Sequence, residues 1–267
     1  MRTRIEQAFR RAARAKRAAF IPFIMAGDPT PRRSVELALA LDRAGADILE
    51  LGVPFTDPIA DGPTIQRAGE RALAAGTTLP TVLHVVRELR YSSEIPVVLF
   101  TYYNPVHAHG AARFAIDAAA AGVDAVLFTD VPTEEAAALR EALAKVELGL
   151  VPLLAPTSTR SRVKAVKRFD PEFVYFVSRT GTTGIQERLE EGLEEQVRQV
   201  RRLTGAPVAV GFGLSSADQV QRVASFADGV VVGSVLVDLI AALGDVPGAA
   251  RELQLAAKSL VTATRRR

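Results

Sequence analysis

Glu50 and Asp61 are the two residues whose type and spacing best suit acid–base chemistry. Glu50 interrupts the apolar run 48–52, which has the composition of a buried strand, and Asp61 follows eleven residues later in a loop rich in proline and glycine. A buried carboxylate is costly unless it is paired or used, and burial raises its pKa toward neutrality. The pair therefore indicates proton transfer at the end of a sheet. A purely structural role remains open for each residue. Glu50 could be an interior residue whose carboxylate is satisfied by backbone groups or a salt bridge, and Asp61 could only form a turn before Gly62.

Three glycine-rich segments in the C-terminal half indicate an anion site. They cover residues 181–184, 211–213 and 233–234, and none contains Lys or Arg. Glycine lets backbone N–H groups approach an anion, and a helix expected over 235–241 would place its positive N-terminal end beside Ser234. Any one segment could be only a tight turn, but three at successive strand ends favour a phosphate site.

The remaining candidates are weaker. Tyr175 lies in the expected strand 173–178 and either packs in the core or points toward Glu50. His84 falls on an expected helix and His107 and His109 in an expected loop, and their spacing matches no zinc motif. The chain has no cysteine, which excludes disulfides and a catalytic thiol. Nucleophile-elbow, Walker and Rossmann motifs are also absent from the sequence.

Eight short apolar runs must position these residues. They are continuous rather than alternating and rich in β-branched residues, as is typical of buried parallel strands. They cover residues 20–25, 48–51, 96–101, 125–129, 149–154, 173–178, 207–211 and 229–233. Helical patterns lie between them at 34–44, 81–90, 111–121, 134–145, 161–167, 189–203 and 217–224. This alternation predicts an α/β fold, a (β/α)8 TIM barrel formed by residues 1–267 as a single domain; a doubly wound open sheet is the competing interpretation.

Side-chain alternation and the connections give further expectations. Ile48, Glu50 and Gly52 should share the inner face of the second strand, with Leu49 and Leu51 against the helices. The sequences 44–47 and 121–124 share an Ala-Gly-x-Asp pattern, in which glycine would end a helix. The long connections 54–63 and 179–191 should form lids over the site. An amphipathic N-terminal helix should cap the barrel with one apolar face, formed by Ile5, Ala8, Phe9, Ala12 and Ala13.

Composition and charge exclude several classes of function. The 267 residues are 48% hydrophobic, enough for a large core. Seven Lys or Arg in 1–17 and three in 265–267 carry the basic excess; the rest holds 23 basic and 29 acidic residues, net −6. No contiguous basic face for nucleic acid is therefore expected. No apolar run is long enough to cross a membrane, and the lack of cysteine fits a cytoplasmic location.

The segment 49–66, LELGVPFTDPIADGPTIQ, resembles the signature of the tryptophan synthase alpha chain family. Shorter matches follow in order at 20–29, 101–105, 130–132, 154–158, 178–184 and 211–215. The resemblance implies a TIM-barrel carbon–carbon lyase of L-tryptophan biosynthesis. Its reaction is the cleavage of indole-3-glycerol phosphate to indole and D-glyceraldehyde 3-phosphate. It also implies no cofactor in this chain and a partner, the tryptophan synthase beta chain, which carries pyridoxal phosphate in an α2β2 tetramer.

The resemblance also assigns roles to individual residues. It implies catalytic roles for Glu50, Asp61 and Tyr175. It implies phosphate contacts at Gly184, Gly213, Gly233 and Ser234. It implies an indole pocket formed by Phe23, Phe100, Leu127 and Phe212. In addition, closure of the two loops is expected to be latched by a hydrogen bond between Thr183 and Asp61.

Three other interpretations share some of these features. A phosphate-binding barrel isomerase or epimerase would use the glycine-rich loops but would leave the segment 49–66 unexplained. A stand-alone lyase would release free indole, which turnover with and without a beta chain would reveal. A non-catalytic module that activates a beta chain is disfavoured because Glu50, Asp61 and Tyr175 are all present.

Overall fold

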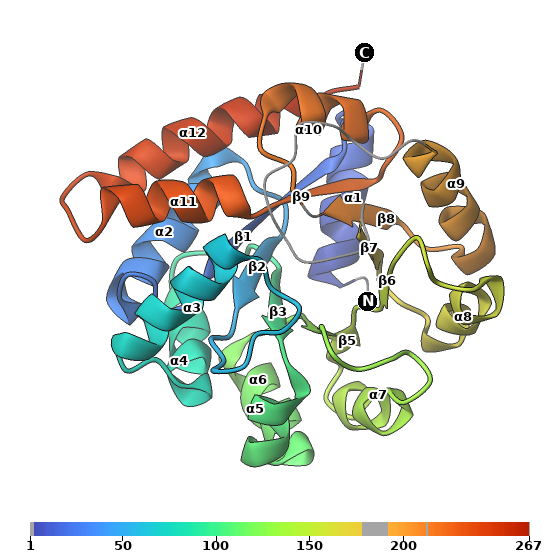
Figure 1. The fold of residues 1–267 in the computed structure, drawn as a ribbon, viewed down its shortest axis with the longest axis horizontal. Coiled ribbons are helices and arrows are strands. Elements are labelled where there is room, and N and C mark those ends of the chain that lie inside the picture. Colours follow the sequence, from blue (N-terminus) through green and yellow to red (C-terminus); the bar gives the residue numbers. More distant parts are fainter. Residues whose placement is uncertain (1–2, 178–191, 212, 267) are drawn as a thin grey trace.

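The computed structural model describes residues 3–177, 192–211 and 213–266, and its strands form one parallel sheet (Figure 1). The strands are β1 (Ala19–Met25), β2 (Leu49–Gly52), β3 (Val97–Thr101), β4 (Ala125–Phe128), β5 (Gly149–Leu150), β6 (Leu153–Leu154), β7 (Val174–Val177), β8 (Val208–Gly211) and β9 (Gly229–Val232). Their order is β5-β4-β3-β2-β1-β9-β8-β7-β6. Every pair is parallel, as the continuous apolar runs predicted.

The sheet closes through the segment that was expected to be a single fifth strand, 149–154. The structure divides this segment into β5 and β6, which is a correction. The N–H of Val151 donates to the carbonyl of Val126 at 2.9 Å, and the N–H of Tyr175 donates to the carbonyl of Pro152 at 3.0 Å. Pro152 has no N–H to continue the ladder toward β4. Consecutive residues therefore bond to β4 and to β7, which confirms the TIM barrel.

Helices surround the sheet (Figure 1). They are α1 (Arg4–Arg14), α2 (Pro31–Ala44), α3 (Pro63–Ala74), α4 (Leu79–Arg90), α5 (Tyr103–His109), α6 (Ala111–Ala121), α7 (Ala137–Ala144), α8 (Arg160–Val166), the 3-10 helix η1 (Lys167–Phe169), α9 (Leu193–Thr204), α10 (Ala217–Ala224), α11 (Ser234–Leu243) and α12 (Ala249–Ala263). None of those within the described ranges is long and apolar enough to cross a membrane.

Three helices differ from expectation. His107 and His109 lie on α5, not in a loop; this helix has only seven residues, and its Pro105 is tolerated because it falls in the first turn. The helix expected from residue 134 begins only at Ala137. Helix α12 was not predicted, although Leu253 and Ala257 face the core with helical spacing.

The alternation predicted for the second strand is confirmed. Leu49 and Leu51 pack in the layer between sheet and helices. Ile48 packs inside the barrel, in the cluster that also holds Phe23 and Tyr175.

Aspartates fix the ends of the barrel where strands begin. Gly45 ends α2 with a φ of 100°, and Gly122 ends α6 with a φ of 90°, as the repeated pattern predicted. The aspartates then accept a backbone N–H from the preceding strand: Asp47 from Phe20 at 2.8 Å, Asp124 from Val97 at 2.8 Å and Asp228 from Val208 at 2.9 Å. Each also pairs with an arginine; these are Arg17, Arg90 and Arg201.

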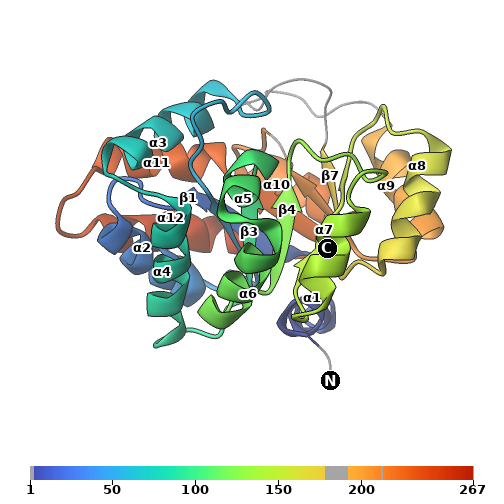
Figure 2. The ribbon, with the colours of Figure 1, turned by 90° about the horizontal axis from the view of Figure 1, so that it is seen from below.

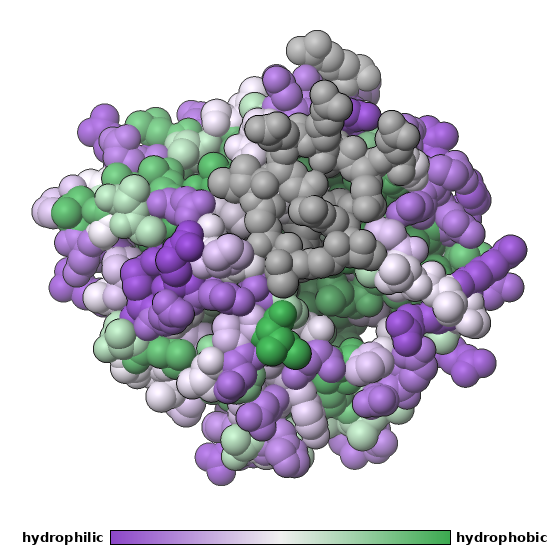
Figure 3. Space-filling view, in the orientation of Figure 1, coloured by the Kyte–Doolittle hydropathy of each residue, from purple (hydrophilic) through white to green (hydrophobic). Residues whose placement is uncertain are grey.

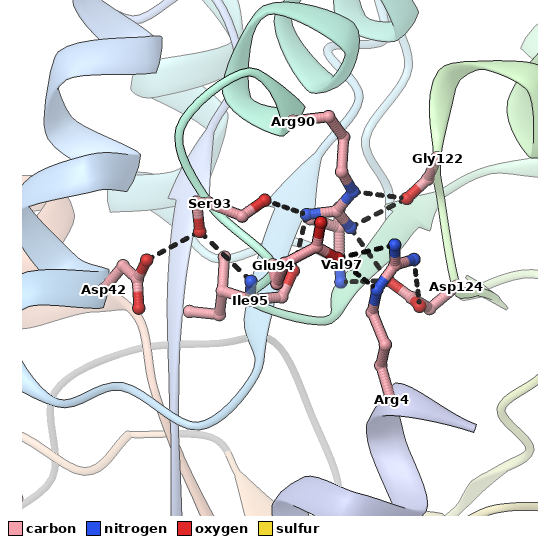
Figure 4. A network of polar contacts seen from close by, with 9 residues as sticks. All are labelled: Arg4, Asp42, Arg90, Ser93, Glu94, Ile95, Val97, Gly122 and Asp124. Atoms are coloured by element: carbon pink, nitrogen blue, oxygen red, sulfur yellow. Dashed lines mark hydrogen bonds and ion pairs between the residues drawn. The ribbon is translucent and has the colours of Figure 1, made fainter. Parts of the chain in front are cut away.

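The Asp124 network ties α1 to the barrel (Figure 4). Arg90 donates to the carbonyl of Gly122 at 2.7 Å and to Asp124 at 2.9 Å. Arg4 of α1 reaches the other oxygen of Asp124 at 3.3 Å and Glu94 at 2.8 Å. Arg90 is mostly buried while Arg4 is 41% exposed, so the inner pair carries the larger energetic weight.

Helix α1 covers the end of the barrel opposite the loop 53–62 (Figure 2). Ile5 and Phe9 are buried, and the ring centroid of Phe9 lies 5.3 Å from that of Phe173 inside the barrel. The expected capping role is therefore confirmed. Ala13 is exposed, contrary to expectation, because it lies about 80° around the helix from Ile5, at the edge of the apolar face.

Candidate active site

A cavity opens at the end of the barrel where the strands finish. It is lined by Phe23, Glu50, Asp61, Ile65, Phe100, Tyr175, Gly213, Val231, Gly233 and Ser234. Polar residues dominate this face of the molecule, with isolated apolar patches between them (Figure 3). The structure thus gathers most of the residues that the sequence singled out. Gly184, Phe212 and Thr183 lie outside the described residues.

Glu50 stands on β2 in register with Phe23 on β1 and Val98 on β3. It is 2% exposed, although it is a carboxylic acid. Burial, and next the negative charge of Asp61, raise the pKa of Glu50 to about 8. Glu50 is therefore protonated at neutral pH and able to donate a proton into the cavity.

Asp61 lies near the end of the loop 53–62, two residues before α3. The backbone fixes this position, since Gln66 Nε2 donates to the carbonyl of Asp61 at 2.8 Å and the N–H of Asp61 donates to the carbonyl of Pro58 at 3.1 Å. Burial raises the pKa of Asp61 to about 7, although a hydrogen bond from Tyr102 acts in the opposite direction and lowers the pKa. Its Oδ1 is buried and has no hydrogen-bond partner among the described residues. Such an oxygen calls for a donor on a bound molecule.

Tyr102 is a site residue that the sequence analysis did not single out. It follows β3 directly, and its hydroxyl accepts a hydrogen bond from the N–H of Ala60 at 3.0 Å. Its ring packs on Phe55, with centroids 5.2 Å apart. Burial and the nearby charge of Asp61 raise the pKa of Tyr102, so the hydroxyl keeps its proton. Its place at the end of the strand beside Glu50 was the signal that could have identified it.

Tyr175 lines the cavity from β7. On the neighbouring strand β8, Gly211 has no side chain, and a Cβ there would lie 2.2 Å from the Tyr175 hydroxyl oxygen. Burial raises the pKa of Tyr175 well above its ordinary value, and the charges of Glu50 and Asp61 add to this. Tyr175 is thus a neutral hydroxyl close to both carboxylic acids.

The opposite wall of the cavity is formed by the start of α11. Helix α11 begins at Ser234, as expected from the sequence, with Gly233 as its N-cap. The first helical bonds run from the N–H groups of Leu236 and Val237 to the carbonyl of Gly233, so the N–H of Ser234 belongs to the first turn that no helical carbonyl satisfies. Gly213 adopts a φ of 78°, which favours glycine. This wall suits an anion.

Apolar residues complete the cavity. Phe23 and Phe100 meet edge to face, with ring centroids 5.4 Å apart at 78°. Ile65 and Val231 also line the space, which the sequence analysis did not anticipate. Leu127 is fully buried in the same apolar cluster but is not among the lining residues. The walls therefore suit a flat apolar ring between the carboxylic acids and the anion wall.

No group of three or more His, Asp or Glu side chains is arranged to hold a metal ion within the described ranges. The chemistry that the described side chains can supply is thus proton transfer by Glu50, Asp61 and Tyr175, with backbone N–H groups for an anion.

Comparison with known proteins agrees with this arrangement. The family described as tryptophan synthase alpha chain matches residues 9–265. The tryptophan synthase alpha chain of Solibacter usitatus is 51% identical over 253 residues, covering 95% of this chain and 94% of the relative. A structure of Mycobacterium tuberculosis tryptophan synthase superposes with a TM-score of 0.90 at 34% identity, covering 99% of each chain. A chain of the tryptophan synthase α2β2 complex of Pyrococcus furiosus gives a TM-score of 0.85 at 38% identity, covering 92% of this chain and 99% of that one. This chain therefore belongs to the tryptophan synthase alpha chain family.

Proposed function

We propose that this chain cleaves indole-3-glycerol phosphate to indole and D-glyceraldehyde 3-phosphate, the alpha reaction of tryptophan synthase. The observation that carries the proposal is the buried, unpartnered Oδ1 of Asp61 in the same cavity as Glu50. An indole N–H would satisfy that oxygen, and the apolar walls would hold the ring. The phosphate would lie against Ser234, Gly233 and Gly213, at the start of α11.

Glu50 is proposed as the group that moves protons. The bond to be broken joins indole C3 to a side-chain carbon that carries a hydroxyl. Protonation of C3 by neutral Glu50 makes an electron-deficient ring, and the electrons of the breaking bond then return to that ring. The carboxylate left on Glu50 accepts the hydroxyl proton as the carbon becomes an aldehyde, which restores the neutral acid. A raised pKa suits a group that both gives and takes a proton near pH 7.

Asp61 and Tyr175 are proposed to serve the same step. As a carboxylate, Asp61 stabilises the positive charge that develops on the ring when C3 is protonated. The neutral hydroxyl of Tyr175 lies beside both acids and can hydrogen-bond the substrate hydroxyl or Glu50. Three further residues are proposed to serve the same reaction. Gly184 would contact the phosphate, Phe212 would contact the indole ring, and Thr183 would form the latch to Asp61.

A beta chain is the proposed partner. The similar P. furiosus structure is of an α2β2 complex, and pyridoxal phosphate is expected in the beta chain rather than in this one. Ile59, at 80% exposure, and Tyr103 lie on the face where the cavity opens. We propose that this face docks the beta chain, so that indole passes directly between the active sites.

The deciding experiment measures indole and glyceraldehyde 3-phosphate released by the purified chain, alone and with added beta chain. The proposal expects equal amounts of both products and faster turnover with the beta chain. Full activity that does not change on adding a beta chain would indicate a stand-alone lyase. No release in either condition would indicate a non-catalytic activator and would overturn the proposal.

A further inference from the structure

A second hollow lies at the other end of the barrel, beside α1. This basal cavity is lined by the arginines Arg10, Arg17, Arg201 and Arg266, with Asp228 and Phe9. The arginines come from α1, the residues that follow it, the end of α9 and the C-terminal segment. The cavity therefore collects the basic residues of both ends of the chain, which the proposed reaction does not use.

The arginines exceed the carboxylates that neutralise them. Arg17 pairs with Asp47, and Arg201 bonds to Asp228 at 2.8 Å. Arg10 has no ion-pair or side-chain hydrogen-bond partner within the part of the chain that the structure describes.

The hydrogen bonds of Arg266 go to neutral carbonyl oxygens, which do not compensate a positive charge. They are those of Ala224 at 3.0 Å and Ala227 at 2.7 Å. Its contact with Asp228 is 3.9 Å long, and Arg201 shares that carboxylate. Among the residues that line this cavity and the carboxylate paired with Arg17, four guanidinium groups thus face two carboxylates, which leaves a charge of +2 on the arginine side.

The paired chain ends hold Arg17 and Arg266 in place before any ligand arrives. The N–H of Ala18 donates to the carbonyl of Thr264 at 3.0 Å, and the N–H of Arg266 donates to the carbonyl of Lys16 at 3.0 Å. Arg266 uses two of its five N–H donors on carbonyls, so others remain for a ligand. A site whose donors are already ordered loses less entropy on binding.

We propose that the basal cavity binds a small phosphate monoester. Such a group carries about −1.5 to −2 charges at pH 7, which matches the excess charge, and guanidinium groups bind phosphate oxygens in pairs. Phe9 and Pro207 supply an apolar wall for the rest of the molecule. The adjoining hollow, which Arg10 also lines, contains three acidic residues, Glu6, Asp170 and Glu172, against Lys167, so an anion is favoured on the arginine side.

Titration calorimetry with phenyl phosphate at pH 7.5 and fixed ionic strength tests the proposal. The proteins are the wild type, Arg10→Gln and the control Arg11→Gln, which removes the same charge from an exposed position of α1 that does not line the cavity. Arg10→Gln should weaken one binding event roughly tenfold, by the loss of one charge-assisted contact. Arg11→Gln should bind like the wild type.

Binding at the barrel mouth is common to the three proteins and cancels in the comparison. Arg10 is exposed, so its replacement should leave the fold intact, which thermal unfolding without ligand would verify. Phenyl phosphate should then raise the melting temperature of the wild type and of Arg11→Gln more than that of Arg10→Gln. Identical isotherms in all three proteins, or equal weakening in both variants, would overturn the proposal.

Discussion

The N–H of Ala60 donates a hydrogen bond to the hydroxyl of Tyr102 at 3.0 Å, which ties the loop that carries Asp61 to the end of β3. Tyr102 also donates to Asp61 and lowers its pKa. One side chain therefore sets both the position and the protonation of a proposed catalytic carboxylate.

Tyr102→Phe should reduce kcat about tenfold. The loop that carries Asp61 loses the hydrogen bond that anchors it, and Asp61 itself loses a hydrogen bond worth on the order of 1 kcal/mol. Loss of that bond raises the pKa of Asp61, so a larger fraction is protonated at a given pH. Because the proposed step uses ionised Asp61, the acidic limb of the kcat/KM profile should move to higher pH. Tyr103→Phe, at the exposed neighbouring position, is the control. Identical pH profiles for the two variants would contradict this role.

Ser234→Asp should raise the KM for indole-3-glycerol phosphate at least about tenfold, since a carboxylate at the start of α11 repels the substrate phosphate. Ser234→Asn, similar in size to Asp but neutral, should have a smaller effect on KM. A KM unchanged by the aspartate would exclude the phosphate from this wall.

Glu50 should make the protein less stable as pH rises. Its pKa is about 8 in the folded chain against an ordinary value of 4.5. Between these values the folded state binds more protons than the unfolded state, so the free energy of unfolding decreases with pH. The contribution is full below pH 4.5 and is lost as pH rises through about 8.

Urea denaturation of the wild type and Glu50→Gln at pH 5, 6.5 and 8 measures this effect. Because glutamine does not titrate, the variant should gain stability relative to the wild type with rising pH, by up to about 1.4 kcal/mol per pH unit. A difference in the free energy of unfolding between the two proteins that stays the same at all three pH values would mean that the pKa of Glu50 is not raised.

Asp124→Ala should lower the free energy of unfolding by about 3–5 kcal/mol, because it leaves the buried Arg90 without its carboxylate. It also removes the acceptor of the Val97 N–H. Arg4→Gln should cost less than about 1 kcal/mol, since its ion pair with Glu94 is exposed. Urea denaturation of both variants measures the two changes in the free energy of unfolding. Similar decreases would contradict the claim that the buried Arg90–Asp124 pair contributes more to stability than the exposed pair of Arg4.

The barrel itself could be predicted from the sequence because its strands are short, apolar runs at regular spacing. Period-two alternation was enough to point Glu50 inward, as the structure shows. Pro152 is a sequence signal for the division of 149–154, but which neighbouring strand each residue bonds is decided only when the sheet closes. Helix α5 was missed because seven residues give little periodic signal.

Part of the proposed site could also be predicted from local sequence patterns. Residues that break a local pattern, such as a carboxylate in an apolar strand or glycines at strand ends, stand out in the sequence. Ile65 and Val231 do not, because apolar residues that line a cavity look like those of the core. Tyr102 acts through contacts with Ala60 and Asp61, which lie about 40 residues away in the sequence and meet it only in the fold.

Glu50 is proposed to move the proton that breaks the carbon–carbon bond. The decisive measurement is the single-turnover release of indole from indole-3-glycerol phosphate by Glu50→Gln, compared with the wild type. The rate should be lower by about 10²–10⁴-fold with substrate affinity retained, because the phosphate wall and apolar walls remain. A Glu50→Gln rate within about twofold of the wild type, against that 10²–10⁴-fold expectation, would contradict this role.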